Sequence, residues 1–334
     1  MGDGRAARLL RHLEGVAYWA AAAPVLARLP AVLGYRMACW RGDWLCRQHT
    51  LKRADLERSL RRVLGGELSR AAVRQATRDW FRFASCEAVD VMRLRHRARP
   101  LRRLVTIRGR EHLEEALAAG KGAILCSAHF GAYDSSFSVL HTSGFPVTTI
   151  GRWQYKYTPG LSSAERRFWN WALARRLRRH RQRPNIEPWP GRFQVAALAA
   201  SALRAGEVVT ICVDAPPLDS DKARAIGVPF LGNEARLVPG VVTLAQLTGA
   251  PVLPCFLYRS ADYRHQVLEI SAPVPMEGDT TTAFARCAAE VSAAIRRSPA
   301  SWVYWPSPVD LGNLGLIPSE REASPVPELA VHAR

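Results

Sequence analysis

The chain contains no Cys-x-x-Cys pair and no apolar run of the roughly 20 residues that a membrane-spanning helix needs. Its 7 cysteines are odd in number, and several lie in apolar, strand-like runs, where a free thiol packs as a small hydrophobic group. We therefore expect a reducing compartment, no disulfide framework and no metal site. The apolar stretch at 16–29 is interrupted by Pro24 and Arg28, which favours a core or interfacial helix over a membrane span or a signal peptide.

Acidic residues are also scarce: the chain has 29 Asp and Glu against 47 Lys and Arg, which gives a net charge of +18. The electrostatic field of this positive charge favours anionic partners: nucleic acid, an anionic membrane surface or phosphorylated small molecules. No zinc-finger, RNP-like or helix-turn-helix signature is present, so we do not expect nucleic acid as a partner. Residues 165–183 interleave aromatic side chains with arginines, which is typical of a helix lying on an anionic membrane surface. A solvated basic helix is the alternative.

Hydrophobic patterning divides the chain into three regions. Residues 1–100 are basic and predicted to be helical and membrane-interfacial, with helices at 54–65 and 69–94, the second capped by Ser69. Residues 101–310 are predicted to form the α/β core, and residues 311–334 a loosely ordered tail.

Within the core region, helical segments alternate with short apolar strands. This alternation predicts an α/β fold with a mixed, mostly parallel central sheet covered by helices. The strands are predicted over 104–109, 122–127, 145–151, 207–214, 251–258 and 265–271. Active sites in such sheets lie at the carboxyl ends of the strands.

One strand end carries the residues best suited to chemistry. In KGAILCSAHFGAYDSS, residues 121–136, an apolar strand ends in a small-residue turn with His129, and Asp134 follows five residues later. An imidazole can take a proton from a hydroxyl, and a carboxylate on its other nitrogen fixes the tautomer. Gly131 permits the bend that would bring the next helical turn, with Asp134, back to His129. A chain of this composition contains about 0.8 His-x-x-x-x-Asp/Glu spacings by chance, so the spacing alone is weak evidence for a catalytic pair. The stronger evidence is the position of the pair, at a strand end that is followed by a glycine turn and a predicted helix.

Five blocks of sequence, in this order, carry a resemblance to a known family: SAHFGAYD, GRWQYKY, LRAGEVVTICVD, GVPFLGNEARLVPGVVTLAQLTGAPVLPCF and SWVYWPSP. From about residue 15 to residue 306 the chain resembles the bacterial lipid A lauroyl/myristoyl acyltransferases, a family that includes phosphatidylinositol mannoside acyltransferases. The resemblance implies transfer of a fatty acyl group from acyl-CoA or acyl carrier protein to a hydroxyl of a membrane glycolipid. It implies no cofactor, and a peripheral position on the cytoplasmic side of the cell membrane.

The resemblance also implies roles for single residues. His129 would be the general base and Asp134 its orienting acid. Gly131 would belong to the substrate-binding turn, with the helix-terminal amides beyond it ready for an oxyanion. Arg152 would hold a phosphate or pantetheine group; one more surface arginine is the alternative.

Three further positions are expected to bind the acceptor. Asp214 aligns with the first acid of the family's Asp-Gln-Asp stretch, which here reads Asp-Ala-Pro-Pro, and would line the acceptor pocket or cap its loop. Glu234 and Arg236 lie just ahead of a predicted helix and would contact the acceptor; a solvated ion pair is the alternative.

Three functions remain open from the sequence. The first is the membrane-associated acyltransferase, acting in one step, since no Gly-x-Ser-x-Gly elbow indicates an acyl-enzyme. The second is an acyltransferase for a soluble or natural-product hydroxyl or amine, which the departure after Asp214 favours. The third is a catalytically inactive lipid- or nucleic-acid-binding protein on the same scaffold.

Overall fold

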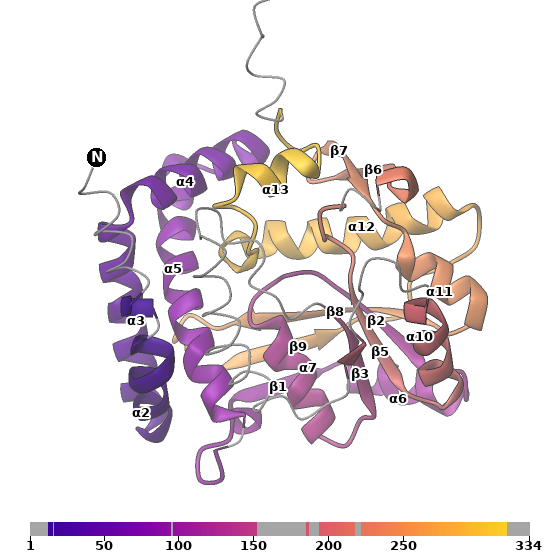
Figure 1. Ribbon diagram of the computed structural model, residues 1–334, viewed down its shortest axis with the longest axis horizontal. Helices are drawn as coiled ribbons and strands as arrows, with labels where there is room; N and C mark the ends of the chain where they lie inside the picture. The colour runs from indigo at the N-terminus through magenta and orange to yellow at the C-terminus, as the bar shows by residue number, and fades with distance from the viewer. Residues whose placement is uncertain are drawn as a thin grey trace, which may run out of the picture.

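A central sheet organises the chain. The computed structural model describes residues 13–15, 17–94, 96–151, 185–186, 194–217 and 222–318. Within these residues, seven strands form one sheet in the order β1-β9-β8-β2-β5-β3-β4 (Figure 1). Every neighbouring pair is parallel except β8 and β9. The predicted α/β fold with a mixed, mostly parallel sheet is therefore confirmed. The strands are β1 (Val105–Arg108), β2 (Ala123–Ser127), β3 (Val147–Ile150), β4 (Asn185–Ile186), β5 (Val208–Cys212), β8 (Val252–Arg259) and β9 (Gln266–Ile270).

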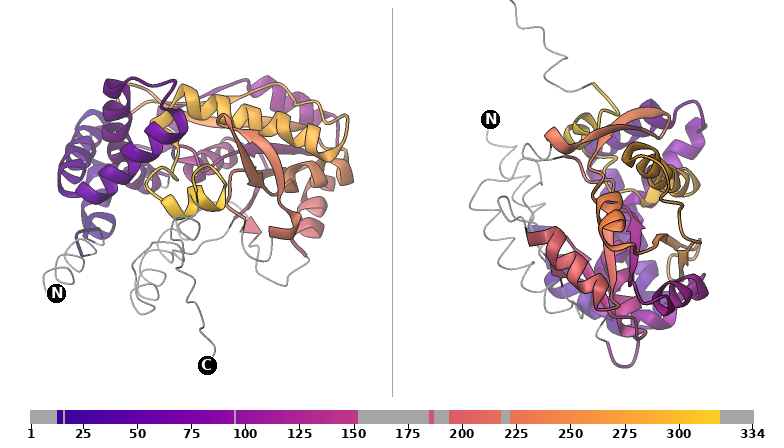
Figure 2. Two further views of the ribbon diagram at one scale, coloured as in Figure 1. Left: turned by 90° about the horizontal axis from the view of Figure 1, so that it is seen from above. Right: turned by 90° about the vertical axis from the view of Figure 1, so that its right-hand side faces the viewer.

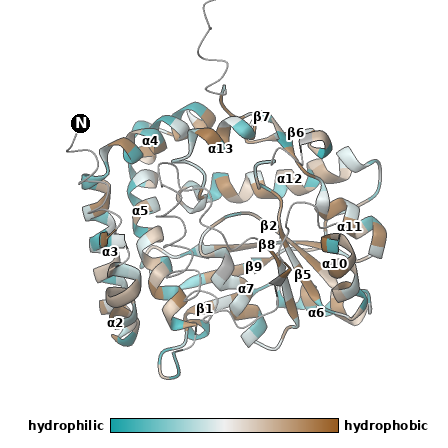
Figure 3. Cartoon of the chain, viewed as in Figure 1, coloured by the Kyte–Doolittle hydropathy of each residue, from teal (hydrophilic) through white to brown (hydrophobic). Residues whose placement is uncertain are grey.

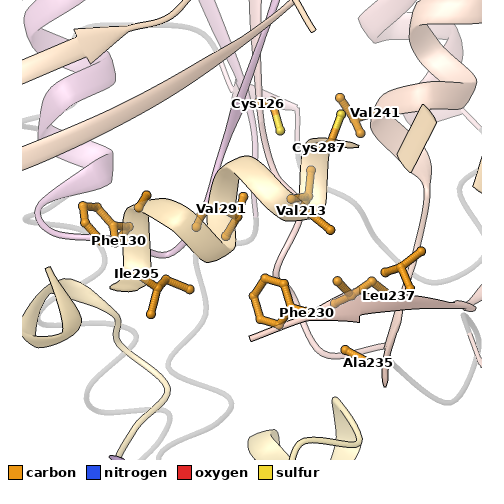
Figure 4. Close-up of a cluster of buried hydrophobic side chains, with 14 of the residues drawn as sticks. Cys126, Phe130, Val213, Phe230, Ala235, Leu237, Val241, Cys287, Val291 and Ile295 are labelled. Carbon is orange, nitrogen blue, oxygen red and sulfur yellow. The ribbon is translucent and has the colours of Figure 1, made fainter. Parts of the chain in front are cut away.

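Helices cover both faces of this sheet (Figures 1 and 2). Side chains alternate between the two faces of a strand, and all five residues of β2 are buried. Ile124 and Cys126 pack into the core beneath α10, α11 and α12, whereas Ala123 and Leu125 pack with α6 and α7. The helices are α6 (Arg110–Ala118), α7 (Tyr133–Thr142), α10 (Gln194–Arg204), α11 (Gly240–Thr248) and α12 (Thr280–Arg297). Figure 4 shows the α12 side of this core.

The strands predicted from the sequence are all present, with ends that agree to within about two residues. A two-stranded antiparallel hairpin was not predicted: β6 (Ile226–Phe230) and β7 (Asn233–Leu237). Its two-residue turn places both Leu231 and Gly232 at positive φ, the backbone twist that joins antiparallel strands tightly.

The N-terminal region forms a helical layer beside the sheet (Figure 1). Ser69 caps α5 as predicted, accepting a hydrogen bond from the Ala72 amide over 3.2 Å. The first half of α5 packs into the main core through Val73, and its second half packs against α2 and α3 through Val89. The layer comprises η1 (Tyr18–Ala22), α2 (Ala23–Arg28), α3 (Ala31–Gln48), α4 (Thr50–Leu64) and α5 (Arg70–Arg93).

No helix in the described part of the chain combines the length and the apolar composition needed to cross a membrane.

Three short 3₁₀ segments and one helix complete the described chain: η2 (Leu101–Leu104), η5 (Lys222–Arg224), η6 (Pro299–Ser301) and α13 (Pro308–Asn313). A loosely ordered tail was predicted over 311–334, of which the structure describes 311–318. In this described part Leu311, Leu314 and Leu316 are buried in the main core, because α13 folds back onto it. The boundary at residue 100 between a membrane-interfacial region and the core stays a prediction.

Candidate active site

Two neighbouring strands bring His129 and Asp214 to the same edge of the sheet. β2 and β5 are parallel, and their register pairs Ser127 with Cys212. The Val213 amide continues the ladder by donating to the Ser127 carbonyl over 2.9 Å. His129 and Asp214 each follow two residues after this last pair, so both side chains meet beyond the carboxyl ends of central strands.

The two side chains form a hydrogen-bonded pair. Nδ1 of His129 lies 2.9 Å from Oδ1 of Asp214, and the His129 backbone amide donates to both carboxylate oxygens at 3.0 and 2.9 Å. The Asp214 side chain has no exposed surface, whereas the His129 side chain is 24% exposed. A carboxylate on Nδ1 favours the tautomer with its proton there, which leaves Nε2 as the acceptor for a proton. The pair therefore has the arrangement of a general base with its orienting acid.

A C-terminal segment holds this pair from the other side. Trp302 Nε1 donates to Oδ2 of Asp214 over 2.7 Å. The Val303 amide donates to the His129 carbonyl over 3.1 Å, and the Tyr304 hydroxyl lies 3.2 Å from His129 Nδ1. Burial raises the pKa of Tyr304 well above its ordinary value, so this hydroxyl stays neutral. Residues 302–304 thus fix both the acid and the imidazole.

Gly131 holds the turn that follows His129. Its φ of 58° lies in the left-handed region, and its amide donates to the Ser301 carbonyl over 2.6 Å. A Cβ at this position would lie 2.7 Å from the Leu257 carbonyl oxygen, so only glycine fits without displacing β8. α7 then begins at Tyr133, whose ring centroid lies 5.0 Å from that of His129.

The other predicted site residues are distributed as follows. Asp134 lies in the first turn of α7, but its side chain is outside the described residues, as are Arg152 and the basic segment 165–183. Asp214 was expected to line an acceptor pocket or to cap its loop; in the structure its two oxygens accept hydrogen bonds from His129 and Trp302, and contact with an acceptor stays a prediction.

Glu234 and Arg236 lie exposed on β7 of the hairpin, ahead of α11 as predicted. Arg236 Nη2 donates to the Ala225 carbonyl over 3.0 Å, which ties the start of β6 to β7. The Arg236 amide donates to the Leu314 carbonyl, so the hairpin is also joined to the chain after α13. Contact of either side chain with an acceptor stays a prediction.

One group in the described part of the chain has the composition of a metal site. Ligand atoms of His129, Cys212 and Asp214 all lie within 4.8 Å of one another. Cys212 is half-buried at the end of β5.

The sequence matches the bacterial lipid A biosynthesis acyltransferases over residues 5–305, nearly the whole chain. The chain belongs to this family. The resemblance inferred from five blocks of sequence is thereby confirmed. A lipid A biosynthesis acyltransferase of Haemophilus influenzae is 26% identical over 199 residues, which are 59% of this chain and 56% of that protein. The match thus spans little more than half the length of that relative.

Two residues of the site were not predicted, Trp302 and Tyr304. Both lie in SWVYWPSP, a block that carried the resemblance to the acyltransferase family. Aromatic residues in such a block are read most readily as core, and Trp302 is indeed fully buried. Trp302 contributes to the site through the hydrogen bond that its indole nitrogen donates to Asp214. No local sequence pattern indicates which acid accepts that hydrogen bond.

Proposed function

We propose that this protein is an acyltransferase that moves a fatty acyl group from a thioester, acyl-CoA or acyl carrier protein, to a hydroxyl of a membrane glycolipid of the lipid A class. The observation that supports this best is the accessible His129 ring with its Nδ1 hydrogen-bonded to the fully buried Asp214. Family membership supplies the reaction class, and the geometry supplies a base for it.

The reaction follows from this pair. Nε2 of His129 takes the proton of the acceptor hydroxyl as its oxygen attacks the thioester carbonyl carbon. The buried Asp214 carboxylate stabilises the imidazolium that forms. When the tetrahedral intermediate collapses, the carbon–sulfur bond breaks and the leaving thiolate takes the proton from His129. The products are an ester and a free thiol, and no external oxidant or reductant is needed.

The N-terminal end of α7 supports the same step. This helix of ten residues starts four positions after His129, and its first residue, Tyr133, contacts the imidazole ring. A helix N-terminus carries a partial positive charge and favours an adjacent anion. We assign it to the oxyanion that develops on the thioester carbonyl.

We further propose that α3 places the protein on an anionic membrane. One face of α3, with Gly34, Ala38 and Gly42, packs on α2 and α5. The opposite face carries Leu33, Met37, Trp40 and Trp44 at spacings of four, three and four residues, with exposed fractions of 50, 52, 72 and 39%. Such spacing aligns side chains on one side of a helix. Figure 3 shows α3 at the outer edge of the molecule, with hydrophilic and hydrophobic segments along its ribbon.

Positive charge borders this α3 stripe. Exposed Arg36 and Arg47 adjoin it on the same helix, and the whole chain carries +18. An apolar stripe bordered by arginines fits the headgroup region of an anionic bilayer, where tryptophan is favoured.

Acyl transfer is tested with purified protein, acyl-CoA and acyl-carrier donors, and a lipid extract or purified lipid A precursor as acceptor. We expect acylated glycolipid by mass spectrometry, and a loss of two to four decades in rate for His129→Ala. His265→Ala is the matched control, because His265 also pairs with an aspartate, Asp262, but on an exposed loop. Transfer unchanged in His129→Ala would remove this residue as the base. Lipid bound without any turnover would instead indicate the binding protein.

Membrane docking is tested by co-sedimentation with vesicles of phosphatidylglycerol and of phosphatidylcholine. We expect binding to the anionic vesicles that weakens with salt and falls at least tenfold in the double variant Met37→Glu, Trp40→Glu. Leu247→Glu is the control, since Leu247 is 58% exposed on α11, away from the stripe. Equal binding by both variants would reject the α3 stripe. A change from dimer to monomer without loss of vesicle binding would assign it to a second copy of the chain.

A further inference from the structure

Cys212 is a third side chain beside His129 and Asp214 that carries a possible metal ligand. It is the last residue of β5, opposite Ser127 in the register, and its side chain is half-buried. The proposed acyl transfer does not use its thiol. Nevertheless the ligand atoms of Cys212, His129 and Asp214 lie within 4.8 Å of one another.

We propose that these three side chains bind Zn²⁺, and that bound zinc blocks acyl transfer. Thiolate, imidazole and carboxylate are the three ligand types that zinc takes from proteins. Three protein ligands leave the fourth tetrahedral position open to water. The sequence contains no Cys-x-x-Cys spacing and therefore predicted no metal site. The proposed ligands are far apart in the sequence, and β2 and β5 bring them together.

The three side chains would need to move only a short distance toward one another to coordinate zinc. With Zn–S of about 2.3 Å and Zn–N or Zn–O of about 2.0 to 2.2 Å, tetrahedral ligand atoms lie about 3.3 to 3.8 Å apart. The three side chains would therefore move together by no more than about 1.5 Å. The strand ends that carry them are joined by the hydrogen bond from the Val213 amide to the Ser127 carbonyl.

Charge and outer hydrogen bonds suit the ion as well. Metal binding displaces the proton of a thiol ligand to solvent, so the Cys212 thiolate and the Asp214 carboxylate would together balance the charge of Zn²⁺. Trp302 Nε1 donates to Oδ2 of Asp214. Hydrogen bonds of this kind orient ligating carboxylates in metal sites.

Zinc in this position removes the base. Binding through Nδ1 of His129 breaks the hydrogen bond to Asp214, and binding through Nε2 occupies the lone pair that accepts the hydroxyl proton. In either case the imidazole cannot take a proton from an acceptor. The inhibitory half of this inference rests on the proposed function, whereas the binding half does not.

Binding is tested on the whole protein after treatment with a chelator, by titration with Co²⁺ and displacement by Zn²⁺. We expect a thiolate-to-cobalt charge-transfer band that zinc abolishes. In Cys212→Ser the band should be absent and zinc affinity at least about tenfold lower, since loss of even an outer-shell partner costs about 10- to 100-fold. Cys46→Ser is the control, because Cys46 is a half-buried thiol on α3. No band, or equal zinc affinity in Cys212→Ser, would overturn the site.

Inhibition is measured as acyl transfer at buffered free zinc, with each protein compared with its own zinc-free rate. We expect inhibition that a chelator reverses, and a half-inhibitory zinc concentration at least about tenfold higher in Cys212→Ser. Zinc bound at Cys212 without inhibition would overturn the regulatory role. Failure of the proposed function is distinct, because it would appear as no transfer in the absence of zinc while the cobalt band persists.

Discussion

The indole of Trp302 donates a 2.7 Å hydrogen bond to Oδ2 of Asp214, 88 residues away in the sequence. The other oxygen of Asp214 accepts from the amide and lies 2.9 Å from Nδ1 of His129. A buried carboxylate is tolerated when both oxygens have such partners. The indole thus gives the second oxygen of Asp214 a hydrogen-bond donor and fixes the orientation of the carboxylate behind the imidazole.

Trp302→Phe is expected to lower kcat by about tenfold with a smaller change in KM, because the donor to Asp214 is lost while much of the ring packing stays. The loss of stability is expected to be about 1–3 kcal/mol. Trp305→Phe is the control, since it removes an equally short indole hydrogen bond, to the Pro299 carbonyl, from another fully buried tryptophan. Equal losses of kcat in the two variants, measured by steady-state kinetics, would argue that Trp302 acts only through packing.

Asp214→Asn and Asp134→Asn separate two candidates for the acid that orients His129. We expect Asp214→Asn to reduce kcat by two or more decades, because an amide in place of the carboxylate neither stabilises the imidazolium nor selects the tautomer. Asp134→Asn measures the role predicted from the His-x-x-x-x-Asp spacing. The test is the kcat of acyl transfer measured for both variants. A larger loss of kcat in Asp134→Asn than in Asp214→Asn would indicate that Asp134 orients His129.

Gly131→Ala is expected to destabilise the protein by about 2–4 kcal/mol and to reduce activity. The added Cβ would lie 2.7 Å from the Leu257 carbonyl oxygen, at a residue whose φ is 58°, and left-handed backbone strain adds about 1 kcal/mol. Gly120→Ala is the control, because Gly120 also has positive φ but meets no atom within 4 Å. Urea unfolding of both variants checks the difference, and similar losses would show that the contact with β8 is unimportant.

Asp43 gives the helical layer a predicted pH dependence. Partial burial would raise its pKa, but hydrogen bonds from Arg78 and Arg82 outweigh this and hold the pKa of Asp43 well below its ordinary value. A carboxyl with a lowered folded-state pKa stabilises the protein above its unfolded pKa of about 3.9, and this contribution is lost as pH falls toward the folded pKa.

Asp43→Asn is therefore expected to lower the free energy of unfolding by about 1.5–3 kcal/mol at pH 7. The difference in the free energy of unfolding between the variant and the wild type should become smaller below about pH 4. Asp55→Asn is the control, because Asp55 pairs with the exposed Arg58 and such pairs contribute about 0–1 kcal/mol. Urea unfolding at pH 7 and pH 3 provides the test; a gap that does not change with pH would contradict the assignment.

Local sequence patterns determined the elements of this fold and one half of its site. Period-two and helical spacing predicted the main strands and helices, since such patterns report which face of an element is buried. The end of β2 predicted His129, and the order of five blocks predicted the family. The hairpin of β6 and β7 was missed because the charged side chains of Glu234 and Arg236 leave one of its faces exposed, which hides the apolar pattern of a strand.

Only the tertiary structure decided what surrounds His129. Asp214 lies 85 residues away and reaches the imidazole through the register of β2 against β5, while Trp302 reaches Asp214 from the C-terminal side of the chain. Register is set by packing of whole strands and helices. The sequence therefore determined that a histidine would end a buried strand, and the three-dimensional pairing decided that Asp214, Trp302 and Cys212 would be its neighbours.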